Sequence, residues 1–128
     1  MKRILIDTNI YVAFKRNVKE IVEALRTVDY IGINTVVLGE LYAGFKGGIK
    51  EKKNKGELDK FLDSPRVEVI PIDEATSEVY AHIFWNLRKK GYPIPTNDIW
   101  VAASAFQHNL ALFTLDSHFN KVDGLILQ

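Results

Sequence analysis

Four carboxylates lie where a fold of alternating strands and helices presents its ligands: Asp7, Glu40, Asp98 and Asp116. In a parallel sheet, ligand sites form outside the carboxyl ends of the strands, where loops and helix N-termini gather. Asp7 and Asp116 follow apolar runs directly, whereas Asp98 and Glu40 fall early in helical patterns. We therefore expect these acids, which come from four distant segments, to converge at one edge of a sheet.

Such a cluster of carboxylates has a chemical requirement. Uncompensated carboxylates within a few ångströms of one another repel and raise one another's pKa values, and a divalent cation removes that conflict. The chain contains no Cys, and oxygen ligands alone favour hard cations, so the predicted cofactor is Mg²⁺ or Mn²⁺, as one or two ions. Such a site activates water and binds a phosphate, which predicts hydrolytic phosphoryl chemistry.

Each acid also has an ordinary structural explanation. Asp7 can cap a helix, and Asp98 can complement the dipole of a first helical turn. Glu40 can lie on an exposed helix face, and Asp116 can form a turn. The prediction of a site therefore depends on all four acids together.

The elements that would position the acids follow from apolar patterning. The predicted strands cover residues 3–6, 30–33, 67–72 and 110–114, with a further edge strand at 125–127. The predicted helices cover residues 10–14, 18–25, 36–45, a long segment between an Asp73 cap and Gly91, and a last segment that reaches residue 106. This alternation predicts a single domain, residues 1–128, of the α/β class, with three α/β/α layers around a mainly parallel sheet of four to five strands.

Polar residues mark the predicted helix starts. Asn34 or Thr35 is expected to cap the helix over 36–45, and Thr96 or Asn97 the last helix. Between them, residues 46–60 are rich in Gly and Lys, which predicts a solvated connection with a helix only toward residue 62. The lysines of this segment can form a solvated surface, bind phosphate groups or border a protein-binding groove.

Composition excludes several classes of protein. With 47% hydrophobic and 26% charged residues, no apolar run approaches the roughly 18 residues that a membrane span needs. An acid at position 7 interrupts any apolar region of a signal peptide, so we expect a cytoplasmic protein. The net charge of +1 gives no overall sign of nucleic-acid binding.

The sequences around the four acids resemble those of PIN-domain ribonucleases, specifically the VapC-type toxins of bacterial and archaeal toxin–antitoxin pairs. The resemblance spans nearly the whole chain, in the expected order. The matching stretches are Ile4-Leu5-Ile6-Asp7-Thr8-Asn9, Gly39-Glu40-Leu41, Asn97-Asp98-Ile99-Trp100-Val101-Ala102-Ala103 and Phe113-Thr114-Leu115-Asp116-Ser117-His118-Phe119.

The resemblance implies a PIN-like fold and an endoribonuclease that depends on Mg²⁺ or Mn²⁺, hydrolyses RNA and leaves a 5′-phosphate. It implies that Asp7 and Asp98 are the principal metal ligands. It also implies that Glu40 and Asp116 bind a second ion or act through water.

The same resemblance implies supporting residues and partners. Thr114, Thr8 and Asn9 would orient a ligand or a water molecule, while Leu115 stands where many relatives carry a basic residue. Family members pair into homodimers and are silenced by a small antitoxin that brings a basic side chain or a helix to the acidic pocket.

Two other functions use the same residues. Asp7 at a strand end also suggests an aspartyl-phosphate phosphatase, but such enzymes usually carry a second acid two residues on, where this chain has Asn9. A noncatalytic module that binds RNA or protein is the other alternative, and it has no need of four clustered acids.

Histidines and aromatic residues are assigned structural roles. His82, His108 and His118 show no shared metal-ligand spacing, and we expect His108 to end a helix and His118 to pack a turn beside Phe119. Four aromatic residues at helical spacing are expected in the core or at a dimer surface: Tyr80, Phe84, Trp85 and Tyr92.

Overall fold

A computed structural model describes residues 2–128, so that Met1 of the predicted domain lies outside the described residues. Four strands form one sheet in the order β3-β2-β1-β4, and every neighbouring pair is parallel. They are β1 (Arg3–Ile6), β2 (Tyr30–Asn34), β3 (Val67–Ile70) and β4 (Ala111–Phe113). The predicted parallel sheet is confirmed, and its four predicted strands lie within one or two residues of the observed bounds.

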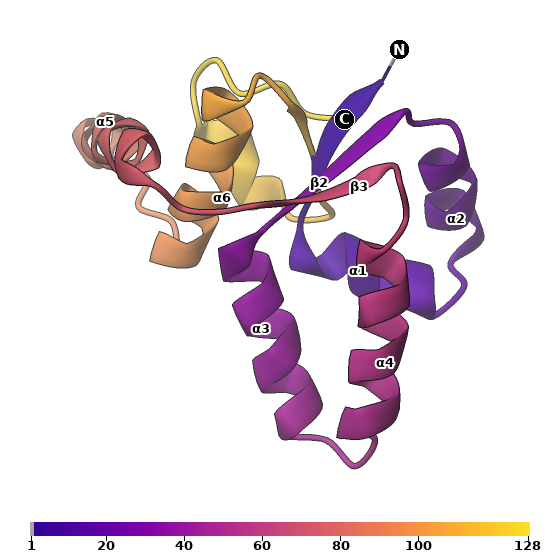
Figure 1. Cartoon of the computed structure of the whole chain (residues 1–128). Helices are drawn as coiled ribbons and strands as arrows, with labels where there is room; N and C mark the ends of the chain where they lie inside the picture. Colours follow the sequence, from indigo (N-terminus) through magenta and orange to yellow (C-terminus); the bar gives the residue numbers. More distant parts are fainter. Residues whose placement is uncertain (1) are drawn as a thin grey trace.

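Among these residues, six α-helices and one short 3₁₀ helix connect and cover the strands. They are α1 (Thr8–Lys15), α2 (Lys19–Arg26), α3 (Thr35–Lys46), α4 (Glu51–Leu62), α5 (Glu74–Lys90), α6 (Thr96–Gln107) and η1 (Ser117–Lys121). Figure 1 shows α5 and α6 on one side of the sheet and α1 and α2 on the other, with α3 and α4 extending beyond the carboxyl ends of the strands. The α/β class is therefore confirmed.

The central strand explains why the sheet needs helices on both faces. Ile4, Leu5 and Ile6 of β1 are completely buried, as expected for a parallel strand whose two faces are both covered. Gly32 of β2 fits where a larger residue would not, because a Cβ atom there would lie 2.6 Å from the Cδ1 atom of Ile70.

Local capping signals set several helix ends. The side chain of Asn34 accepts hydrogen bonds from Val36 N at 2.7 Å and Val37 N at 3.1 Å, so its predicted cap of α3 is confirmed. The predicted Asp73 cap of α5 is confirmed as a capping box, and Gly91 ends that helix with a left-handed φ of 75°, a conformation that glycine adopts without strain.

The predicted cap of α6 is wrong. Pro95 occupies the cap position, and neither Thr96 nor Asn97 provides a side-chain cap. The amide of Asn97 instead donates to Glu40 Oε2 at 3.3 Å.

Residues 46–60 are mostly exposed, as predicted, but the predicted extent of the connection is wrong. Only residues 47–50 link α3 to α4, a helix of 12 residues. Leu58 of α4 is completely buried, and the Phe61 ring meets the Tyr11 ring edge to face at 5.1 Å. This one-sided burial stabilises α4, whose lysines lie mainly on the exposed face.

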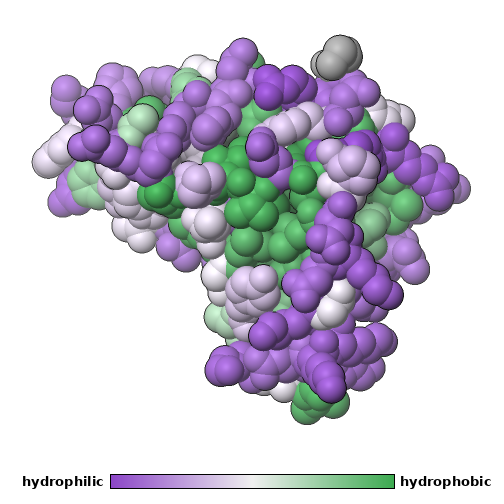
Figure 2. Space-filling model, in the orientation of Figure 1, coloured by the Kyte–Doolittle hydropathy of each residue, from purple (hydrophilic) through white to green (hydrophobic). Residues whose placement is uncertain are grey.

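The predicted edge strand at 125–127 is reduced to one parallel bridge between Leu112 and Leu127. No helix in the described part of the chain is both long enough and apolar enough to cross a membrane. Figure 2 shows hydrophobic residues gathered in the centre of one face, between α3 and α4, with hydrophilic residues around them.

Candidate active site

The fold brings the four acids to the carboxyl edge of the sheet. Asp7 follows β1 and caps α1, and Asp116 follows β4 and caps η1. Asp98 lies in the first turn of α6, and Glu40 lies in α3. The ordinary capping roles are thus observed as well, and they coexist with convergence.

A buried asparagine joins the two helices that carry Glu40 and Asp98. The Asn34 side chain is fully buried and donates from Nδ2 to Ser104 Oγ at 2.9 Å and to the Trp100 carbonyl at 3.5 Å. Because Asn34 also caps α3, its side chain ties the start of α3 to the middle of α6.

Asp7 is the most enclosed of the four acids, with only 5% of its surface exposed. Its Oδ1 accepts from Thr8 N at 2.8 Å, and its Oδ2 accepts from Thr114 Oγ1 at 2.8 Å and Asn9 Nδ2 at 3.4 Å. Burial raises the pKa of Asp7, Thr114 and Thr8 oppose that rise, and nearby acids add to it.

Thr114 links the two strand ends. Its hydroxyl donates to Asp7 and accepts from Asp116 N at 3.0 Å. Asn9 adds a second link, because its Oδ1 accepts from Leu115 N at 3.1 Å.

Glu40 is held by two neutral side chains. Its Oε1 accepts from Thr8 Oγ1 at 2.6 Å, and its Oε2 accepts from Asn97 Nδ2 at 3.3 Å. Thr8 therefore contacts Asp7 through its backbone and Glu40 through its hydroxyl. Asn97 belongs to one of the stretches that resemble the PIN-domain ribonucleases. Its hydrogen bond to Glu40 could not be predicted, because it depends on how α3 packs against α6.

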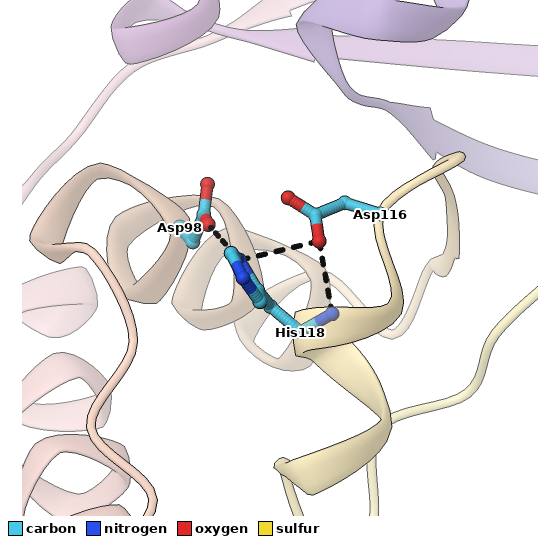
Figure 3. A group of neighbouring side chains, drawn as sticks. All are labelled: Asp98, Asp116 and His118. Carbon is cyan, nitrogen blue, oxygen red and sulfur yellow. Dashed lines mark hydrogen bonds and ion pairs between the residues drawn. The ribbon is translucent and has the colours of Figure 1, made fainter.

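Asp98 and Asp116 face a histidine. His118 Nδ1 lies 3.4 Å from Asp98 Oδ2 and 3.2 Å from Asp116 Oδ1, and Figure 3 shows the ring between the two carboxylates. Asp116 Oδ1 also accepts from His118 N at 2.9 Å. The prediction that His118 packs the turn was therefore incomplete: Phe119 is fully buried, whereas His118 joins the acids.

Burial raises the pKa of Asp98, and the negative charges of Asp7 and Asp116 raise it further. Contact with His118 opposes the rise. Across residues 2–128, no Lys or Arg forms an ion pair with any of the four acids. An oxygen-rich cluster that no Lys or Arg of residues 2–128 neutralises has the donor set that a hard divalent cation requires, so these residues fit such an ion.

The acids border an open hollow of about 540 Å³, whose lining includes Asp7, Glu40, Asp98 and Asp116. A second hollow of about 440 Å³ lies between α1, α3 and α4. Both are lined by Thr8, Val12, Arg16 and Glu40, so they form one continuous groove.

Other residues singled out in the sequence lie elsewhere. His108 follows the last residue of α6, as predicted, and His82 is exposed on α5. Tyr80 stacks on Trp100 with ring centroids 4.0 Å apart. Trp85 and Tyr92 are 59% and 49% exposed, so neither belongs to the core.

The sequence has recognisable relatives. The PIN domain family model matches residues 4–125. The protein named Ribonuclease VapC4 of Mycobacterium tuberculosis is 34% identical over 88 residues, which cover 69% of this chain and 68% of that protein. Ribonuclease VapC2 of Rickettsia felis is 32% identical over 107 residues, covering 83% of this chain and 78% of that protein.

Solved structures share the fold. A chain in the crystal structure of VapBC2 from Rickettsia felis bound to a promoter DNA fragment is 30% identical, with a TM-score of 0.88, and the match covers 97% of this chain and 96% of that chain. A chain of DNA-bound VapBC from Salmonella typhimurium has a TM-score of 0.89 at 23% identity, covering 100% and 98%. The second similarity concerns the fold alone.

Proposed function

Because the chain belongs to the PIN-domain family, we propose that it is a metal-dependent endoribonuclease and the toxin of a VapBC-type toxin–antitoxin system. The observation that carries the proposal is the convergence of Asp7, Glu40, Asp98 and Asp116 on one hollow, where no Lys or Arg of residues 2–128 forms an ion pair with them. The ribonuclease names of its curated relatives support RNA as the substrate.

Asp7 and Asp98 are proposed as the principal ligands of Mg²⁺ or Mn²⁺. Glu40 and Asp116 would bind a second ion or act through water. When bound, the ion would supply charge stabilisation at the scissile phosphate and would lower the pKa of a water molecule. These roles agree with the hydrolytic chemistry expected of the acids.

Neutral neighbours are proposed to orient the acids before RNA binds. Thr114 and Asn9 hold Asp7 Oδ2, and Thr8 holds Glu40 Oε1. Carboxylates that are already positioned need less reorganisation during the reaction. We therefore assign Thr8, Asn9 and Thr114 positioning roles rather than direct contact with the reacting phosphate.

The partner proposed for the groove is a small antitoxin. The part between α1, α3 and α4 offers apolar surface from Val12, Leu41 and Phe45 and leads to Glu40. An amphipathic segment can bind such a surface, and a basic side chain at its end would neutralise the acids. Asn54 and Glu57 of α4 line this groove, so we assign α4 to antitoxin contact rather than to RNA.

A homodimer is proposed through the exposed aromatic surface of α5. Trp85 is 59% exposed, and the guanidinium carbon of Arg88 lies 6.0 Å from its ring centroid. Sedimentation equilibrium should give a dimer for the wild type and a larger monomer fraction for Trp85→Ser. A monomeric wild type would contradict this assembly and leave the ribonuclease proposal intact.

RNA cleavage tests the catalytic proposal. Purified protein should cleave a cellular RNA pool with Mg²⁺ or Mn²⁺ and leave 5′-phosphate ends, and EDTA should stop the reaction. Asp98→Asn should be inactive, whereas Glu20→Gln, which changes an exposed acid on α2, should keep full activity. Cleavage that survives both EDTA and Asp98→Asn would overturn the proposal.

The alternative phosphatase is disfavoured by the surroundings of Asp7. Both of its oxygens accept hydrogen bonds, and only 5% of its surface is exposed, so an in-line approach to a phosphate ester is restricted. Hydrolysis of small phosphate esters, with intact RNA, would favour the phosphatase. RNA binding without cleavage would favour the noncatalytic module.

A further inference from the structure

We propose that the imidazole of His118 binds a metal ion together with Asp98 and Asp116, and so shifts the ion preference of the site toward Mn²⁺ and Co²⁺ over Mg²⁺. This inference rests on the proposed metal-dependent function. It goes further because it assigns a nitrogen ligand, in addition to the four acids.

The distances among the three side chains suit a shared ion. One ligand atom from each of Asp98, Asp116 and His118 can be chosen so that all three lie within 4.8 Å of one another. Around an ion with bonds of about 2.1 Å, neighbouring octahedral ligands lie about 3.0 Å apart and opposite ones about 4.2 Å. The observed separations of 3.2 Å and 3.4 Å from His118 Nδ1 lie between these values.

The backbone fixes the direction of the histidine. Asp116 caps η1 by accepting from His118 N at 2.9 Å, which places both residues of this turn beside one another. The next residue, Phe119, is completely buried and anchors η1 in the core. In Figure 3 the ring of His118 consequently points toward both carboxylates and not away from the fold.

Solvent access is consistent with a metal site. The side chain of His118 is 52% exposed, and those of Asp98 and Asp116 are 16% and 32% exposed. Water can therefore complete the coordination of an ion held by these three residues. A site closed on all sides would leave no position for water or for a phosphate oxygen.

Ligand chemistry predicts which ions bind more tightly when His118 is a ligand. Mg²⁺ favours oxygen ligands in near-ideal octahedral geometry and retains several waters. Imidazole nitrogen suits transition metals, and affinities for such sites rise from Mn²⁺ to Co²⁺. His118 should therefore strengthen Mn²⁺ binding more than Mg²⁺ binding.

Pulsed electron paramagnetic resonance tests the ligand directly. Mn²⁺ bound to the full chain should show echo modulation from a directly coordinated ¹⁴N nucleus. The modulation should disappear in His118→Gln and persist in His82→Gln, which changes an exposed histidine on α5. Bound Mn²⁺ without nitrogen modulation in the wild type would overturn the assignment of His118.

Calorimetric titration separates this inference from the proposed metal site. His118→Gln should weaken Mn²⁺ binding by on the order of tenfold and Mg²⁺ binding by less than about threefold. Asp98→Asn should weaken both ions strongly. Equal Mn²⁺ affinity in the wild type and His118→Gln would refute the inference alone, whereas a wild type that binds neither ion would refute the metal site as well.

Circular dichroism should show that each variant is folded before it is titrated. His118 is exposed and its side chain contacts the two carboxylates, so His118→Gln should retain the fold. His118→Asn is a second variant with a shorter amide side chain, and it should lose the nitrogen modulation as His118→Gln does.

Discussion

The acidic cluster has two sides, Asp7 with Glu40 and Asp98 with Asp116, which differ in the hydrogen-bond partners of their carboxylates. On the bonded side, Asp7 and Glu40 accept hydrogen bonds from neutral groups that are fixed in helices and at a strand end. On the open side, the side chains of Asp98 and Asp116 share one partner, the His118 ring. The first pair is held by several neutral donors, whereas the second pair faces one ionisable side chain.

Because of this difference, replacing a carboxylate by an amide should change stability and activity differently on the two sides. On the bonded side, an amide in place of a carboxylate meets donors that need acceptors, so hydrogen bonds are lost. On the open side, the same change removes a partly desolvated charge and few hydrogen bonds. Function and stability should therefore separate most clearly at Asp98.

The largest expected effect is on activity at the open side. Asp98→Asn should lower kcat/KM for RNA cleavage by about 100-fold or more, because loss of a few kcal/mol of metal-based charge stabilisation has that effect. Steady-state cleavage of one defined RNA measures it. Activity within about threefold of the wild type would remove Asp98 from the metal site.

Thr114→Val tests the bonded side. The change removes the donor to Asp7 Oδ2 and the acceptor for Asp116 N, so the free energy of unfolding should fall by about 1–3 kcal/mol. Urea unfolding of the metal-free protein measures it, with Thr114→Ser as the control that keeps the hydroxyl. Equal loss in both variants would mean that the methyl group, and not the hydroxyl, supports the site.

Asp98→Asn should raise stability, whereas Thr114→Val should lower it. In metal-free protein it should raise Tm by about 2 °C, which corresponds to roughly 0.5 kcal/mol for a domain of this size. Asp7→Asn should lower Tm, because the Asp7 carboxylate accepts from Thr8, Thr114 and Asn9. An equal fall in Tm for Asp98→Asn and Asp7→Asn would contradict the proposed difference between the two sides.

The pH dependence of the free energy of unfolding follows from the raised pKa values of Asp7 and Asp98. The chief cause of both rises is burial. The native state keeps these protons at pH values where the unfolded chain has released them. The resulting stabilisation is fully present below the ordinary pKa of 3.8 and is lost as the pH rises through the raised values. Because metal replaces the protons, Mn²⁺ should raise Tm more at about pH 7 than at about pH 5.

The smallest expected effect is at Asn97, which donates to Glu40 at 3.3 Å from an exposed position. Asn97→Ala should lower the free energy of unfolding by about 0.5 kcal/mol and reduce cleavage by only a few-fold. Thermal melting and cleavage assays together measure the two effects. A loss of activity as large as that of Asp98→Asn would move Asn97 into direct contact with the substrate or the ion.

Local signals made the strands and most helix ends predictable. The apolar run before Asp7 and the cap at Asn34 depend on neighbours in the chain, and both were confirmed. The start of α4 is not predictable from residues 46–60, because glycines and a scarcity of apolar residues leave little apolar periodicity. The burial of Leu58 that stabilises α4 arises only from tertiary packing.

Within the site, the placement of the acids was more predictable than their partners. Strand ends and helix starts predicted the common edge for Asp7 and Asp98. The position of His118 depended on the 3₁₀ turn that follows Asp116, and the bond from Asn97 depended on the packing of α3 against α6. No pattern in the sequence predicts either of these two contacts.

Thermal melting in the presence of Mn²⁺ tests most directly whether the two sides form one metal site. At a Mn²⁺ concentration of about 100 times Kd, binding to the native state should add about 2.7 kcal/mol of stability, so Tm of the wild type should rise by several degrees at about pH 7, and EDTA should reverse the rise. Asp98→Asn should show little or no rise. A wild-type melting curve that does not respond to millimolar Mn²⁺, or an equal rise in Asp98→Asn, would contradict the account.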